Sequence, residues 1–91
     1  MNFTLHQLKV FITIVENKSI TKAAIELNMT QPAASIQLKN FQDQFDIPLS
    51  EIIGRQFYVT DFGKEIYQIA EEILNKTESI QYKTEAFKGL L

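Results

Sequence analysis

Residues 30–45, TQPAASIQLKNFQDQF, contain the clearest pattern of hydrophobic and polar positions in the chain. Four apolar residues recur there at spacings of four, three and four, which predicts a buried stripe along a helix over residues 31–45. These residues are Ala34, Leu38, Phe41 and Phe45. The opposite face carries small or hydrogen-bonding side chains and one isoleucine, Ile36. A helix with one buried side and one compact polar side suits the major groove of DNA.

Two shorter helical segments precede this helix. Segment 4–16 begins at Thr4, an expected N-cap, and its apolar residues share one face: Leu5, Leu8, Phe11, Ile12 and Val15. Segment 19–27 begins at Ser19, a second expected N-cap, and contains two adjacent alanines that allow another helix to approach closely. Asn28 follows, and asparagine tolerates the positive φ of a tight turn. The two segments 19–27 and 31–45 therefore read as a helix-turn-helix.

The apolar residues no longer follow a helical spacing over residues 49–60. Ile53, Phe57 and Val59 lie there among polar residues, on either side of Gly54 and Arg55. This pattern predicts a short β-hairpin whose tip is formed by the glycine and the arginine. A hairpin that follows a helix-turn-helix is typical of a winged helix-turn-helix.

A helical pattern runs from Asp61 almost to the end of the chain, with Thr60 as its expected N-cap. Gly63 is a poor helix former in the first turn, and we expect it to serve close packing. The apolar seam of this helix repeats near 3.5 residues: Phe62, Ile66, Ile69, Ile73, Thr77, Ile80, Thr84 and Phe87. A helix of roughly 40 Å is longer than a 60-residue head can cover. We therefore expect residues 62 to 80 of the seam to pair with a second copy, the dimerisation set being Phe62, Ile66, Ile69, Ile73, Thr77 and Ile80.

The predicted fold is mainly α: three helices and a hairpin wing in a head over residues 1–60, then a long linker helix over residues 61–91. Composition agrees with one ordered domain, because 45% of the 91 residues are apolar and 11% are aromatic. With no cysteine and one histidine, we expect neither a metal nor another cofactor. No apolar run reaches the ~20 residues of a membrane span and no leader is visible, which favours a cytoplasmic protein.

The net charge of −2 excludes a simple nucleic-acid polycation. Basic and acidic residues cancel over residues 1–60, and the excess of acids lies in residues 61–91. Residues 18–42 contain three lysines (Lys18, Lys22 and Lys39) and one acid, Glu26, so their local net charge is +2. DNA binding would therefore need positioned contacts and two copies of the head.

Several motifs together resemble the DNA-binding head of LysR-type bacterial transcriptional regulators. They are FTLHQLKVFITIVENKSITKAAIELNMTQPAASIQLKNFQDQF, the glycine–arginine wing tip within PLSEIIGRQFYVTDFGKEI, and the Thr-x-x-Gly start of the long helix. The resemblance extends from Phe3 to about Leu90. It implies a winged helix-turn-helix whose linker helix pairs antiparallel with that of a partner. It also implies that an effector-binding domain of periplasmic-binding-protein type, absent from this chain, follows in the intact regulator.

The same resemblance implies partners: double-stranded DNA with an A/T-rich pseudo-palindrome, a second copy of the chain, and a small-molecule inducer bound only by the missing domain. A homodimer is expected, with a tetramer as the alternative for the intact regulator, located at the bacterial nucleoid when bound. Two positions depart from the family pattern. Where the family has phenylalanine and arginine after Pro-Leu, this chain has Ser50 and Ile52, which questions how the wing packs and how it contacts phosphates.

The residues expected at the DNA come from three places: the start of the second helix, the third helix and the wing tip. They are Thr21, Lys22, Thr30, Gln31, Pro32, Ala33, Ser35, Ile36, Gln37, Lys39 and Arg55. The amide of Gln31 can read an adenine edge, Ile36 can cover thymine methyls, and Arg55 fits a narrow minor groove. For Pro32, a role in starting the helix is as good an interpretation as a DNA contact. For Lys39, the alternative to a phosphate contact is a side chain that contacts only solvent.

The rival hypothesis is a helical protein–protein interaction module that does not bind DNA. The acidic balance and the long amphipathic helix would suit it, but the compact polar surface of helix 31–45 favours DNA. An enzyme is the weakest interpretation, because the chain has no nucleophile–base pair, no metal cluster and no phosphate-binding loop.

Overall fold

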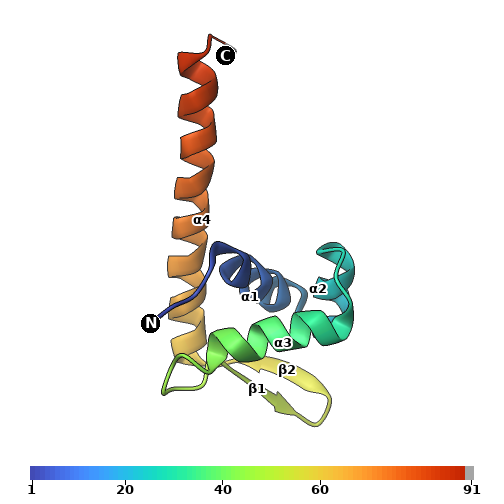
Figure 1. Cartoon of the computed structure of the whole chain (residues 1–91). Helices are drawn as coiled ribbons and strands as arrows, with labels where there is room; N and C mark the ends of the chain where they lie inside the picture. The colour runs from blue at the N-terminus through green and yellow to red at the C-terminus, as the bar shows by residue number, and fades with distance from the viewer. Residues whose placement is uncertain (90–91) are drawn as a thin grey trace.

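The computed structural model of the chain describes residues 1–89, and its element order is the predicted one (Figure 1). The elements are α1 (Leu5–Asn17), α2 (Ile20–Glu26), α3 (Gln31–Gln42), β1 (Ser50–Ile53), β2 (Gln56–Val59) and α4 (Asp61–Phe87). Three helices and a two-stranded hairpin form the head, and α4 rises from the base of the hairpin, so the predicted winged helix-turn-helix with a long C-terminal helix is confirmed.

Helices α1 to α4 each begin directly after the predicted N-cap residue. The side-chain oxygens of Thr4, Ser19, Thr30 and Thr60 each accept a hydrogen bond from a backbone N–H in the first turn. The cap of α1 is reciprocal, because the Gln7 side chain also accepts from the backbone N–H of Thr4 at 3.0 Å. Caps of this kind stabilise a helix by about 1 kcal/mol each.

Helix α1 is buried on more sides than its predicted stripe. Leu8, Phe11 and Ile12 are buried as expected, but Leu5 is 51% exposed. Val10, Thr13 and Ile14, which fall outside the predicted stripe, are buried as well. The reason is tertiary: α1 packs against α2 and α3 and also against α4.

The predicted turn between α2 and α3 is confirmed. Asn28 has a φ of 55°, and the backbone N–H of Met29 donates to the carbonyl of Ala24 at 2.9 Å. Both alanines of α2 are buried, which lets α2 approach its neighbours closely. The chain therefore reverses within a few residues and brings the start of α3 beside α2.

Helix α3 ends at Gln42, three residues before the predicted end at residue 45. After Gln42 the backbone forms i→i−3 bonds, from Gln44 to Phe41 at 3.2 Å and from Phe45 to Gln42 at 3.1 Å. This tighter turn places the Phe45 ring 5.1 Å from Phe41 and 5.9 Å from Phe62 of α4, measured between ring centroids. The fourth residue of the predicted stripe thus packs on the core from outside the helix.

The hairpin is antiparallel, with Ser50 opposite Val59 and Ile53 opposite Gln56. Its two-residue tip, Gly54-Arg55, is the predicted one, and Gly54 has a φ of +62°. A left-handed residue is required in such a turn, and glycine adopts it without steric cost.

The base of the hairpin is fixed to the start of α4. The Thr60 backbone N–H donates to the Leu49 carbonyl at 3.1 Å, and the Thr60 hydroxyl donates to the Pro48 carbonyl at 2.7 Å. Gly63 is buried so tightly that a Cβ atom on it would lie 2.0 Å from the Leu49 carbonyl oxygen and 2.8 Å from Cγ1 of Val59. The expected role of Gly63 in close packing is confirmed.

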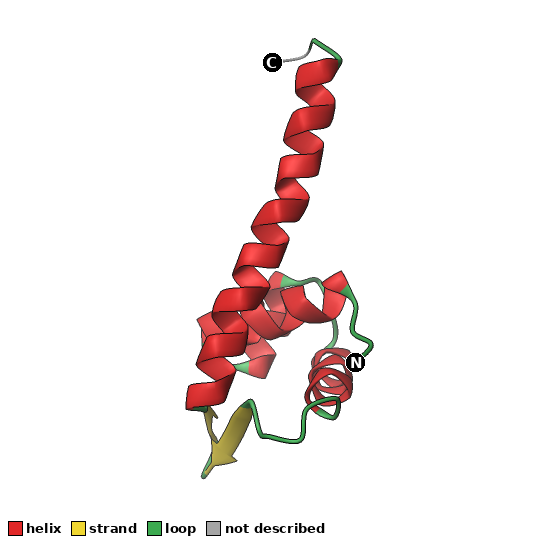
Figure 2. Ribbon diagram, turned by 90° about the vertical axis from the view of Figure 1, so that its left-hand side faces the viewer, coloured by secondary structure: helices red, strands yellow, loops and turns green. Residues whose placement is uncertain are grey.

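The upper part of α4 projects beyond the head, as both views show (Figures 1 and 2). The longest dimension of the molecule is therefore 53 Å, against 27 and 20 Å for the other two. Lower down, the Tyr67 hydroxyl donates to a carboxylate oxygen of Glu16 on α1 at 2.8 Å. Partial burial, with the hydrogen bond to Glu16 and its negative charge, raises the pKa of Tyr67, so the phenol stays protonated as the donor. Within residues 1–89 no helix is long and apolar enough to cross a membrane.

Candidate nucleic-acid interface

The outer face of α3 has the composition that the sequence predicted. Ala34, Leu38 and Phe41 are buried, whereas Ile36 on the opposite side is 58% exposed. The other predicted contact residues on this helix are exposed or half-buried: Gln31, Pro32, Ala33, Ser35, Gln37 and Lys39. The helix therefore presents a convex row of small, amide and hydroxyl groups around one isoleucine.

Gln31 and Ser35 are linked, because Nε2 of the glutamine donates to Oγ of the serine at 2.8 Å. An amide nitrogen has two hydrogens, so a second N–H and the amide oxygen remain for a base edge. The bond holds the amide above the first turn of α3 and limits its rotamers.

Lys39 is engaged within its own helix. Its Nζ lies 2.6 Å from Oδ2 of Asp43, and both side chains are mostly exposed. Exposed i,i+4 ion pairs contribute only about 0.3–0.5 kcal/mol, so a phosphate can replace the carboxylate at small cost. The contact of Lys39 with phosphate stays a prediction, and it requires this exchange.

The wing tip meets the starts of α2 and α3 at one hollow of about 220 Å³. Three predicted contact residues that are far apart in the sequence, Thr21, Gln31 and Arg55, line it together. The other lining residues are Lys18, Ser19, Ile20, Ile52 and Phe57. The fold thus assembles a continuous surface from the helix-turn-helix and the wing.

Lys18 belongs to this surface, although the sequence did not single it out as a contact residue. It follows α1 directly and its side chain is exposed. The local excess of lysine over residues 18–42 was the available signal.

Two predicted contact residues, Thr30 and Lys22, also take part in N-cap hydrogen bonds of the fold. The Thr30 hydroxyl accepts from the backbone N–H of Ala33 at 3.2 Å, so its observed role is the N-cap. Lys22 has an exposed side chain, and its backbone N–H donates to Ser19 at 3.1 Å.

The two departures in the wing have different consequences. Ser50 is half-buried, and its hydroxyl donates to the side-chain oxygen of Gln42, so a hydrogen bond joins β1 to the end of α3. Ile52 is 67% exposed and lines the hollow beside Arg55. The wing therefore offers one cation at its tip and an apolar neighbour.

The predicted dimerisation seam lies beside the face of α4 that covers the head. That covering face consists of Gly63, Tyr67, Ala70 and Leu74, at spacings of four, three and four. Along the seam, the lower residues Phe62, Ile66 and Ile73 are half-buried and pack partly on the head. Ile69 and Ile80 are 51% and 69% exposed, and Thr77 donates to the Leu74 carbonyl at 2.6 Å.

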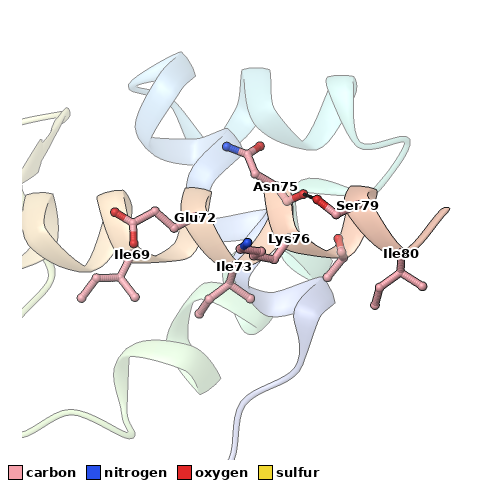
Figure 3. Close-up of a pocket in the computed structure, with 8 residues that line it drawn as sticks. Ile69, Glu72, Ile73, Asn75, Lys76, Ser79 and Ile80 are labelled. Atoms are coloured by element: carbon pink, nitrogen blue, oxygen red, sulfur yellow. Dashed lines mark hydrogen bonds between the residues drawn. The ribbon is translucent and has the colours of Figure 1, made fainter. Parts of the chain in front are cut away.

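Figure 3 shows Ile69, Ile73 and Ile80 along one side of α4, where they line a shallow groove. Glu72 and Lys76 line the same groove. An apolar row beside charged side chains has the composition of a helix-pairing surface. Among the described residues no three His, Asp or Glu side chains lie close enough to hold a metal ion.

Comparison with known proteins places this architecture in one family. Residues 5–64 match the family described as "Bacterial regulatory helix-turn-helix protein, lysR family". The chain is 38% identical over 89 residues to the HTH-type transcriptional activator CmpR of Synechocystis, covering 98% of this chain and 29% of that protein. It is 32% identical over 90 residues to a RuBisCO operon transcriptional regulator of Allochromatium vinosum, covering 99% and 30% respectively.

A solved structure agrees. The DNA-binding domain of BenM in complex with a catB site 1 DNA superposes with a TM-score of 0.88 at 31% identity, over 94% of this chain and 97% of that one. The chain spans about 30% of the length of the curated relatives. It belongs to the lysR family of bacterial regulatory helix-turn-helix proteins and has the fold of a DNA-binding domain of that kind.

Proposed function

We propose that two copies of this chain bind a pseudo-palindromic, A/T-rich duplex, with α3 in a major groove and the wing tip at the adjoining minor groove. The observation that supports this most is the shared hollow, because it places Gln31 at the start of α3 beside Arg55 at the wing tip. A two-fold dimer would then read half-sites about 34–36 Å apart, or a multiple of that distance.

The charge distribution supports positioned contacts over bulk attraction. Within residues 1–89, Lys39–Asp43 is the ion pair that the structure contains, so Lys18, Lys22 and Arg55 make no ion pair there. Each phosphate neutralised contributes about −0.9 to the slope of log affinity against log salt. With three or four cations in each head, we expect a slope of roughly −5 to −7 for the dimer.

Base reading by α3 is tested with Gln37→Ala and Ile36→Ala. The wild-type protein first selects duplexes from a random pool at fixed salt, and each variant is then measured on the best duplex and on an unrelated one. We expect each variant to bind the selected duplex about 5- to 50-fold more weakly and the unrelated duplex almost unchanged, because base contacts alone carry sequence information. An equal loss on both duplexes would contradict base reading. If the wild-type protein selects no duplex from the pool, the result would favour the protein–protein interaction module that does not bind DNA.

Dimerisation through α4 is tested with Ile69→Glu and Ile80→Glu. A carboxylate on the exposed apolar row would have to be buried between two helices, so we expect both variants to be monomeric at micromolar concentration by light scattering. Gln68→Glu is the matched control, since it adds the same charge at an exposed position about 100° around α4 from Ile69. If both variants remain dimeric, the dimer contact lies outside this apolar row of α4.

We propose that a separate effector-binding domain, in the length of the relatives that this chain does not span, binds the inducer and sets whether the assembly is a dimer or a tetramer. The family is one of transcriptional regulators, and the proposed mechanism includes no catalytic step and no cofactor. We place its action in the cytoplasm at the nucleoid, where its DNA lies.

A further inference from the structure

Lys18 occupies an unfavourable backbone conformation between α1 and α2. Its φ of 53° and ψ of 29° are left-handed. Glycine adopts this conformation freely, whereas the Cβ of other residues crowds the backbone there. Glycine would therefore serve the fold better at position 18, and such strained positions cluster at functional sites.

The surroundings of Lys18 are cationic. The hollow that it lines contains a second cation, Arg55, and two hydrogen-bonding side chains, Thr21 and Gln31. None of the residues that line this hollow is acidic. Two unpaired cations with a hydroxyl and an amide form a surface that favours an oxyanion such as phosphate.

The acids on either side of Lys18 in the sequence, Glu16 and Glu26, each accept a hydrogen bond. Glu16 accepts a hydrogen bond from the Tyr67 hydroxyl on α4, at 2.8 Å. Glu26 accepts one from the Asn17 side chain, at 3.3 Å. Neither forms an ion pair with Lys18 within the described part of the chain. The positive charge of Lys18 is therefore available to a ligand.

We propose that Lys18 is a phosphate-binding residue of the DNA interface and that it contacts the backbone between the major groove entered by α3 and the minor groove at Arg55. This inference rests on the proposed function. The backbone strain at Lys18 costs the fold stability, whereas its side chain supplies one of the few free cations of a nearly neutral head. A phosphate contact is sequence-independent, which distinguishes it from the contacts assigned to α3.

The test compares Lys18→Asn with the wild type. Asparagine tolerates the left-handed conformation but has no charge. Affinity is measured from 50 to 300 mM salt on the duplex selected by the wild type and on an unrelated duplex of equal length. We expect binding about 3- to 10-fold weaker on both duplexes, and a salt slope smaller by about 1 for each Lys18 lost, hence about 2 for the dimer. Lys18→Arg should retain the wild-type slope.

Lys18→Gly separates binding from folding. We expect its Tm to rise by about 2–4 °C, because the backbone strain is removed, while its affinity falls as in Lys18→Asn. Lys88→Asn removes the same charge at the far end of α4 and should bind as the wild type does.

The outcomes distinguish the two hypotheses. If Lys18→Asn binds with wild-type affinity and slope, or if Lys88→Asn weakens binding equally, the assignment of Lys18 is wrong although the proposed function stands. If the wild type binds neither duplex at 50 mM salt, the proposed function itself fails.

Discussion

Replacing Arg55 by alanine is expected to weaken binding to the selected duplex by about 10- to 100-fold, the largest loss among single contact residues. Arg55 is exposed at the tip of a two-residue turn, from which its guanidinium can reach a minor groove. Ile52, its neighbour in the hollow, has no charge to compensate. Titration of labelled duplex at fixed salt measures the effect.

Two comparisons give this experiment its specificity. Arg55→Lys retains the charge but loses the planar guanidinium, so we expect the salt slope to recover while the affinity recovers only in part. Narrow A/T tracts concentrate negative potential, so the arginine should matter more on A/T-rich than on G/C-rich flanks. A loss from Arg55→Ala that is the same on both flanks would argue for a phosphate contact in place of minor-groove reading.

Replacing Gly63 by alanine is expected to destabilise the domain by about 2–4 kcal/mol, or roughly 10–20 °C in Tm for a chain of this size. The added Cβ would lie 2.0 Å from the Leu49 carbonyl oxygen, a backbone atom that cannot rotate away. Alanine gains about 1 kcal/mol in helix propensity, which is smaller than the cost of separating α4 from the base of the wing. Thermal and urea unfolding, followed by circular dichroism, measure the difference.

Gly54→Ala is the matched control for this change. Gly54 has a left-handed φ of +62°, but a Cβ there would meet nothing within 4 Å. We expect a cost of about 1 kcal/mol from backbone strain alone. If Gly63→Ala were as stable as the wild type, helix propensity would outweigh the close contact, and the wing would not depend on this packing.

Much of the fold follows from short-range patterns in the sequence. The four N-caps, the turn at Asn28 and the hairpin tip at Gly54-Arg55 each depend on residues within a few positions of one another. A hydroxyl that accepts from the N–H three residues later forms wherever the chain enters a helix, so such features can be predicted from local sequence. The exposed face of α3 followed from its 3.6-residue period for the same reason.

The features that sequence patterns did not predict depend on distant contacts. Helix α3 ends at Gln42, and the Phe45 ring beyond it packs against Phe62, 17 positions later. The extra burial on α1 arises because α4 returns to cover it, as the Glu16–Tyr67 hydrogen bond across 51 positions illustrates. Neither result is visible in the period of one helix, since each requires the relative placement of two elements.

The sequence by itself therefore determined the order of the elements, their caps and the small polar face of the helix that follows Thr30. Only the tertiary structure decided which face of α4 covers the head, which carbonyl excludes a side chain at Gly63, and that Lys18 lies in one hollow with Gln31 and Arg55. The physical reason is the range of the interactions. Periodicity and capping act over four residues, whereas a binding surface for a duplex is assembled from side chains that only the packed core brings together.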